Sequence, residues 1–492
     1  METQTTRELQ YDQRILRNDL KGHADRIIQG IKKIGPSHAK RAIWELFQNA
    51  VDLSEHCEIT VRVTNDELIF AHNGVPFTMH TLDCLFTQVS SKTLTEKKLE
   101  REDADPVGQY GTGFMTSHSF GDVVQVSGAI QDEFEGEQTN SSANGHIKFT
   151  DLKIDRSTQD WEKLCEEISS HRKHVKGLLN QSLTYGNLPV TQFRFGFNLD
   201  INRQRAFDAI ESLKIILPYV MIFNDKLKKV TVVNNHGHTT VYIKNEHEAT
   251  NEYFHTREIQ VNGEVKKINY LKSDRLIIIL PIDSNPSNNA LIGRAALLPA
   301  SLPRLFLFYP LIGTEHFGFN FVIHSKNFQP TEPRDGLHLN SENEKNNIEE
   351  SANQKLMQEA SDLIFTFLEN HLSKIEHPHL LAEINFPVSS DDAELNKYFK
   401  ELKEKWTNKF KTLPFVEIKN TRISAHEAIF LNDSVIHEAD EPTLTSIYNI
   451  VVKFYESVPK SELIPIWTKL IDDWNILDIV SSSHKCNFFS ST

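Results

Sequence analysis

The arrangement that most constrains the fold of this chain is a regular helical stretch followed at once by a β-hairpin. Pro36-Ser37 is typical of a helix start. Apolar residues then recur at helical spacing, at Ala39, Ile43, Leu46, Ala50 and Leu53. After them, the segment 59–70 alternates apolar and polar residues on both sides of an Asn65-Asp66 turn. A helix and a hairpin so close together predict a mixed α/β fold.

Three domains are expected from a length of 492 residues, at roughly 150 residues per domain. The spacing of apolar residues predicts helices over 161–179, 206–222 and 348–372, and strands over 191–197, 229–233, 239–243, 257–261 and 276–280, with a short strand pair within 415–423. A charged, amide-rich segment at 341–347 is typical of a linker. We therefore expect an α/β domain over 1–202, a second α/β domain over 203–340 and a mainly helical region over 341–492.

The charge balance and the apolar stretches narrow the range of partners. The formal net charge is −14, which argues against general binding to polyanions and confines any contact with nucleic acid to a local basic channel. The N-terminus is polar, and no apolar stretch is both long enough and continuous enough to span a bilayer. The four cysteines form no CxxC pair and fit a reducing compartment. These features predict a cytoplasmic protein without a membrane partner.

The first candidate for chemistry is the polar flank of the helix predicted after Pro36. Glu45, Asn49 and Asp52 fall within about 60° of one another around a helix. A carboxylate beside an amide oxygen suits a bound magnesium ion and an activated water. The alternative is a solvated helix flank with no ligand.

Two glycine-containing segments follow. Asn73-Gly74 comes directly after the predicted hairpin, where it is also typical of a simple tight turn. Further on, Gly108, Gly111 and Gly113 precede a predicted helix. Such glycines let backbone N–H groups approach an anion, although a flexible loop has the same composition. The chain has no Walker A motif and no dinucleotide-binding glycine motif.

Taken in order, and followed by Thr191 on a predicted strand, these segments resemble the GHKL superfamily. That superfamily includes gyrase, the ninety-kilodalton heat-shock chaperones, histidine kinases and the MutL proteins of mismatch repair. Glu45–Asp52 looks like the first box of the family, and Gly108–Phe114 is very similar to the phosphate-lid motif of the chaperones. The resemblance covers residues 20–200, and more loosely 205–340. The segment 328–335 is similar to sacsin-like ATPases.

The resemblance implies a Bergerat-type α/β sandwich that binds Mg-ATP. In such a site Glu45 would be the general base that orients water onto the γ-phosphate, Asn49 would coordinate magnesium, and Asp52 would belong to the same binding helix. Histidine kinases commonly have asparagine in place of the glutamate, so Glu45 favours hydrolysis. A protein histidine kinase remains an alternative, although no helix with a phosphoacceptor histidine is recognisable.

The remaining ligands to the nucleotide are also carried over from the family pattern. Backbone N–H groups of the three loop glycines would bind the triphosphate, with help from the neighbouring Thr112 and Phe114. Lys92 would offset the phosphate charge, unless it is an ordinary solvated loop lysine. Thr191 would help to bind adenine through water. ATP and Mg²⁺ are thus the cofactors that the resemblance implies.

The second box departs from the family pattern. That box normally reads Asp-x-Gly-x-Gly, and its aspartate accepts the adenine amino proton. Here His72 stands in place of the aspartate and Pro76 in place of the second glycine, with Asn73 and Gly74 between them. A neutral imidazole nitrogen or the Asn73 carbonyl would accept one hydrogen bond, but neither bond is charge-assisted. We therefore expect weaker adenine selectivity than in the family.

Related ATPases complete the site with a basic residue from the second domain, for which Arg334 and Lys326 are the candidates here. Alternatively, Arg334 pairs with Glu332 or Asp335. In the family, ATP binding closes a lid and dimerises the N-terminal domains. The resemblance thus implies a homodimer that couples closure to a client, in a chaperone-like, DNA-transaction or antiviral defence role.

A non-hydrolysing scaffold is the main alternative to an ATPase. In that interpretation the altered second box marks a degenerate nucleotide site, and residues 341–492 act as an interaction module. Glu45 favours the ATPase, because a scaffold needs no general base.

Overall fold

The computed structural model describes residues 6–52, 54–88, 113–131, 145–283, 291–331, 334–340, 347–387, 392–419, 421–430 and 441–474. The chain has a mixed α/β fold, as predicted from its sequence. It divides into two compact units. The first comprises residues 1–245 and 259–266, and the second comprises 246–258 and 267–492.

The first unit contains most of the segments singled out above. Its elements are α1 (Thr6–Lys32), α2 (Pro36–Val51), β1 (Cys57–Val63), β2 (Glu67–His72), α3 (Met79–Thr87), α4 (Gly113–Thr116), the 3₁₀ helix η1 (Ser117–Phe120), β3 (Val123–Ile130), β4 (Ile147–Asp155), α5 (Trp161–Leu178), β5 (Thr191–Gly196), α6 (Asp200–Phe223) and β6 (Leu227–Val233). Strands β7 (Thr239–Thr250), β8 (His255–Val261) and β9 (Glu264–Lys272) have residues in both units.

The sheet of the first unit runs in the order β7-β6-β1-β2-β5-β3-β4. Strand β1 pairs parallel with β6. The neighbouring pairs β1–β2, β2–β5, β5–β3 and β3–β4 are antiparallel. Buried and exposed residues alternate strictly along β1, which confirms the predicted hairpin of β1 and β2. The register places His72 opposite Thr191, so the last residue of β2 lies beside the first residue of β5.

Helix α2 follows the predicted period. Pro36 occupies its first turn, where the missing N–H costs nothing. Its stripe of Ile43, Leu46 and Ala50 is buried, as expected. Phe47 on the same helix meets Phe70 of β2 edge to face, with ring centroids 5.5 Å apart. Each such aromatic side chain contributes roughly 1.5–3 kcal/mol by burial, so this contact anchors α2 to the sheet.

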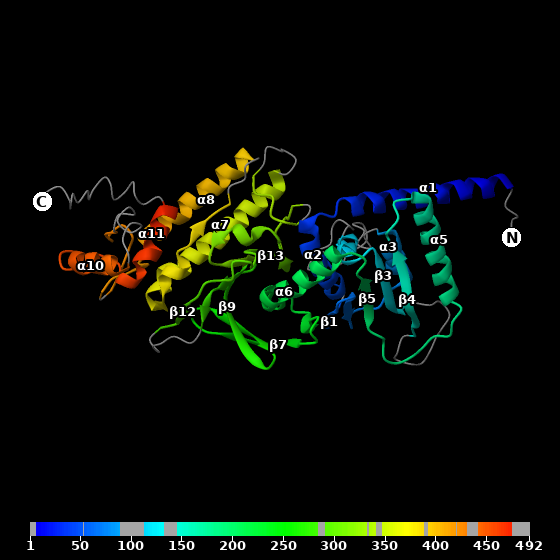
Figure 1. The fold of residues 1–492 in the computed structure, drawn as a ribbon, viewed down its shortest axis with the longest axis horizontal. Coiled ribbons are helices and arrows are strands. Elements are labelled where there is room, and N and C mark those ends of the chain that lie inside the picture. The colour runs from blue at the N-terminus through cyan, green and yellow to red at the C-terminus, as the bar shows by residue number, and fades with distance from the viewer. Residues whose placement is uncertain are drawn as a thin grey trace. The chain divides into compact units, whose positions relative to one another are not determined.

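Helices α1 and α5 pack against each other, with α5 crossing α1 in Figure 1. Leu20, Ala24 and Ile27 of α1 are buried against Leu164 and Ile168 of α5. The three residues of α1 are spaced by four and three positions, which puts them on one face of that helix.

The second unit combines a sheet with a mainly helical C-terminal part. Its strands and helices are β10 (Ile277–Leu280), β11 (Ile282–Asp283), β12 (Gly293–Ala295), β13 (Leu305–Leu307), β14 (Tyr309–Pro310), β15 (Gly318–Phe319), β16 (Val322–His324), α7 (Asn347–His371), β17 (Ile375–Glu376), β18 (Ile384–Asn385), α8 (Ala393–Thr412), β19 (Val416–Glu417), β20 (Arg422–Ile423), α10 (Glu441–Val451) and α11 (Ile464–Asp473). Short 3₁₀ helices include η4 (Leu372–Lys374) and η5 (Pro378–Leu381). The main sheet of this unit runs β14-β13-β16-β10-β9-β8.

Trp406 of α8 lies at the centre of the aromatic core of the second unit. Its ring stacks on Phe319 at 5.2 Å and meets Phe365 of α7 edge to face at 5.2 Å. Its indole N–H donates to the Ser361 hydroxyl at 3.0 Å, so the one polar atom of the buried ring is satisfied. This contact holds α7 and α8 together.

The division into units differs from the three expected domains. The first unit continues past residue 202, because α6 and β6 pack on the N-terminal sheet. The expected linker lies largely outside the described residues, and the third domain stays a prediction. Among the residues that the structure describes, no helix is both long enough and apolar enough to cross a membrane.

Candidate functional site

Glu45 is buried on α2, and each of its two carboxylate oxygens lies against another residue. One carboxylate oxygen accepts a hydrogen bond from the Arg41 guanidinium, one helical turn earlier. The other oxygen faces Gly113, because a Cβ added to Gly113 would overlap it. The last glycine of the glycine-rich segment therefore lies directly against the proposed general base. A larger residue would not fit there without moving Glu45.

The other two polar residues of the first box lie nearer the surface. Asn49, one turn after Glu45, is exposed. Asp52 follows the end of α2, where its carboxylate accepts a bond from Gln48 at 3.4 Å and its carbonyl accepts one from Lys226 at 3.0 Å. Glu45 and Asn49 thus occupy neighbouring turns, one buried and one facing solvent.

The second box packs against the C-terminal turn of α2. A Cβ on Gly74 would come within 2.6 Å of the Ala50 carbonyl oxygen and 2.5 Å of the Ser54 hydroxyl. That hydroxyl donates to the Ala50 carbonyl at 2.7 Å and accepts from the Val75 N–H at 3.3 Å. Glycine is therefore required for close approach rather than for an unusual backbone angle.

His72 is held as a neutral ring. Burial lowers the pKa of His72 to about 4. Its Nδ1 accepts a hydrogen bond from the Gly74 N–H at 3.1 Å, so we infer that the ring proton sits on Nε2. The ring therefore offers a donor, not the acceptor that the sequence suggested.

Asn73 is held to the start of β1 by two hydrogen bonds. Its side-chain oxygen already accepts a bond from the Glu58 N–H at 2.7 Å, and its own N–H donates to the Glu58 carbonyl at 3.2 Å. These two bonds fasten the loop to the start of β1. Asn73 thus has a structural role in this loop.

Aromatic rings link the second box to the glycine-rich segment. Phe193, two residues after Thr191 on β5, stacks on His72 with centroids 6.3 Å apart. It also contacts Phe114 at 5.5 Å and Phe77 at 6.3 Å. Residues two apart on a strand share a face, so Thr191 and Phe193 both lie on the face that carries His72.

The sequence reasoning missed Arg41 and Phe193. The spacing of Arg41 and Glu45 by four residues was a signal for an ion pair on a helix. Nothing in the sequence pointed to Phe193, because its role depends on the pairing of β2 with β5.

Several predicted residues cannot be placed beside these. Lys92, Gly108, Gly111 and Thr112 lie outside the described residues. Lys326 and Arg334 belong to the second unit, where Arg334 has a positive φ of 63° and its N–H donates to the Thr331 carbonyl at 2.6 Å. Their predicted role at the γ-phosphate stays a prediction.

The helix expected after the glycine-rich segment is shorter than a full α-helix. Residues 113–116 form one α-helical turn, and 117–120 continue as a 3₁₀ helix. A single turn has only a small dipole, so any anion binding here depends on individual N–H groups. Separately, an open surface hollow of about 350 Å³ on α5 is lined by Cys165, Glu166, Ser169, Ser170 and Lys173 and contains none of the predicted site residues.

Comparison with protein-family models finds no match, and comparison with curated protein sequences finds none either.

Proposed function

We propose that the chain binds and hydrolyses a nucleoside triphosphate with Mg²⁺, ATP being the nucleotide that the motif order favours. The observation that carries the proposal is the contact between the Glu45 carboxylate and Gly113. It joins a proton acceptor to the end of a glycine-rich segment. Gly74, packed against the C-terminal turn of α2, joins the second box to the same helix.

In the proposed reaction Glu45 accepts a proton from the water that attacks the γ-phosphate. The Arg41 guanidinium holds one oxygen of this carboxylate, so the proton would go to the other oxygen, which faces Gly113. Asn49, one turn later and exposed, would supply an oxygen to Mg²⁺. The magnesium ion would neutralise phosphate charge.

Recognition of the base would differ from that in the family. The Nε2–H of His72 is a donor, and the adenine amino group is also a donor. His72 therefore cannot do what an aspartate does there. A donor at this position instead suits a ring nitrogen or a carbonyl oxygen of the base. We expect the chain to discriminate only weakly between ATP and GTP.

Calorimetry of the intact chain tests binding. We expect one site per chain for ATP with Mg²⁺, and similar affinity for GTP. The variant His72→Asp should favour ATP over GTP by about tenfold or more, since a hydrogen bond to a charged acceptor contributes roughly 1.5–3 kcal/mol. An absence of binding heat with both nucleotides, at two temperatures, would overturn the proposal.

A non-hydrolysing scaffold is the second candidate, and one observation favours it. The buried ion pair of Arg41 and Glu45 gives the carboxylate a structural role that a scaffold would also keep. Glu45 by itself therefore does not separate the two functions. Phosphate release does, because a scaffold binds nucleotide without turnover.

Dimerisation, coupling to a client and a cytoplasmic location are proposals that follow from the family resemblance. Sedimentation of the intact chain with and without a non-hydrolysable ATP analogue tests the first of them. We expect a shift from monomer to dimer when the analogue and Mg²⁺ are present. An unchanged sedimentation coefficient at saturating analogue would contradict nucleotide-driven dimerisation.

A further inference from the structure

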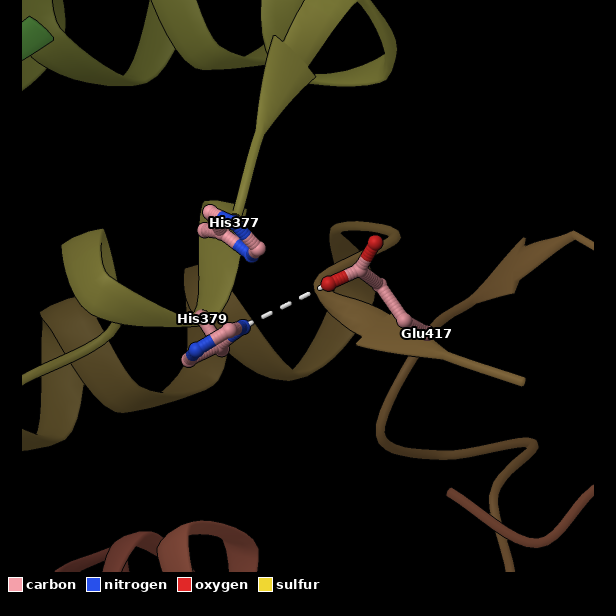
Figure 2. Close-up of side chains that lie close together, drawn as sticks. All are labelled: His377, His379 and Glu417. Carbon is pink, nitrogen blue, oxygen red and sulfur yellow. Dashed lines mark ion pairs between the residues drawn. The ribbon is translucent and has the colours of Figure 1, made fainter. Parts of the chain in front are cut away.

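Two histidines and a glutamate gather at one place in the second unit, far along the chain from the segments discussed above. His377 follows β17, and His379 lies in the 3₁₀ helix η5 two residues later. Glu417 ends β19, in the short hairpin of β19 and β20. Figure 2 shows the three side chains between the turn and the hairpin. One ligand atom from each lies within 4.8 Å of the other two.

The spacing of these atoms fits a tetrahedral metal ion. The Nδ1 atom of His379 lies 3.4 Å from a carboxylate oxygen of Glu417, the contact marked in Figure 2. Two donors each about 2.0–2.1 Å from a tetrahedral ion lie about 3.4 Å apart. That pair is therefore already at the separation of two ligands. The ligand atom of His377 lies within 4.8 Å of those of His379 and Glu417. The His377 side chain is 47% exposed, which leaves it room to rotate toward the ion.

His379 is a buried ring that faces the glutamate. Its side chain is only 5% exposed, and its Nδ1 is directed at the Glu417 carboxylate. A metal bound between them would take both groups as ligands.

The surroundings hold the glutamate in place. Its Oε1 atom accepts a bond from Arg422 at 3.2 Å and lies 4.0 Å from the Lys460 ammonium. Arg422 also donates to the Leu372 carbonyl at 3.0 Å, which ties the hairpin to the turn after α7. Ligating carboxylates are commonly oriented by such bonds on their other oxygen. The two cations also repel a metal ion, so binding should be weaker than at a four-ligand structural site.

We propose that His377, His379 and Glu417 form a zinc site. Two imidazoles and a carboxylate suit Zn²⁺, and three protein ligands leave the fourth position to water on the exposed His377 side. The ion cross-links the segment after α7 to the hairpin of β19 and β20. The site is independent of the proposed nucleotide chemistry, because every ligand lies in the second unit.

Metal titration of the intact, chelator-treated chain tests the proposal. Calorimetry with Zn²⁺ should give one site per chain, and Co²⁺ should give the visible absorption of a four-coordinate ion. The variants Glu417→Gln and His377→Ala should weaken binding by about tenfold or more. His377 is the safer position to change, since its exposed side chain adds little to the core.

The chain offers a matched control. His236 and His238 also stand two residues apart, with ring centroids 6.3 Å apart, and both are exposed. Among the described residues they belong to no group with a nearby carboxylate. The double variant His236→Ala/His238→Ala should bind Zn²⁺ like the parent chain. The proposal is overturned if Zn²⁺ gives no heat, if the control loses binding, or if both folded test variants keep full affinity.

Discussion

Replacing Glu45 by glutamine is the sharpest perturbation of the proposed hydrolysis. Glutamine keeps the shape of the side chain and an oxygen that accepts the bond from Arg41, but it cannot accept a proton. General bases contribute about 10²–10⁴-fold to rate. We therefore expect kcat for phosphate release to fall by about that factor, with nucleotide affinity changed by less than about threefold.

Glu45→Ala is a poorer choice, for a reason that the structure supplies. The side chains of Arg41 and Glu45 are only 11% and 9% exposed. Removing one partner of a buried ion pair costs about 3–5 kcal/mol, because the other charge is left unpaired. Glutamine also removes the charge, but it keeps the hydrogen bond to Arg41 and leaves no cavity, so it should destabilise the chain less than alanine does. Loss of turnover in the alanine variant would thus be confounded by loss of fold.

The assay is steady-state phosphate release beside calorimetric nucleotide binding and thermal unfolding. Glu162→Gln is the matched control, because Glu162 is paired with Arg17 on the surface. It makes the same chemical change and should leave turnover as it is. If Glu45→Gln binds nucleotide and retains turnover within twofold of the parent chain, Glu45 is not the base and the mechanism is wrong.

Three further outcomes are expected. Gly113→Ala should lower turnover at least tenfold, because the added Cβ meets the Glu45 carboxylate. Gly177→Ala is the control, because its added Cβ meets nothing within 4 Å, and it should leave turnover unchanged. Equal turnover in the two variants would refute the contact between Gly113 and Glu45. Burial lowers the pKa of His72 in the folded chain, so the free energy of unfolding should fall by up to about 3 kcal/mol as the pH drops from about 6.5 to 4. The midpoint of urea unfolding, measured at several pH values, should fall less steeply in His72→Gln than in the parent chain. Trp406→Ala should reduce the free energy of unfolding by about 3–5 kcal/mol in urea denaturation, and a loss under 1 kcal/mol would contradict its central place in the core.

Much of the local structure follows from periodicity in the sequence. Helices α2, α5, α6 and α7 were predicted because their apolar residues recur at helical spacing, and β1, β2 and β5 because theirs alternate. Strand β9 was missed. Its first four residues are exposed and its next four buried, so it shows no alternation. Helix α1 was missed because its N-terminal stretch is polar and mixed in charge.

The candidate site was predictable only in part. The closeness of Gly74 and Gly113 to α2 was implied by the family resemblance, but not by any single motif. The proton position on His72 depends on one hydrogen bond from Gly74, which no sequence pattern reports. Likewise, His379 and Glu417 lie far apart along the chain and meet only because the β19–β20 hairpin packs beside the turn after α7.

The most direct measurement of the central claim is photoaffinity labelling of the intact chain with an azido-adenine nucleotide, followed by peptide mapping. The label should appear on peptides carrying His72–Phe77 or Thr191–Phe193, and unlabelled ATP with Mg²⁺ should prevent it. Labelling confined to the second unit, or labelling that excess ATP does not reduce, would contradict a nucleotide site at α2.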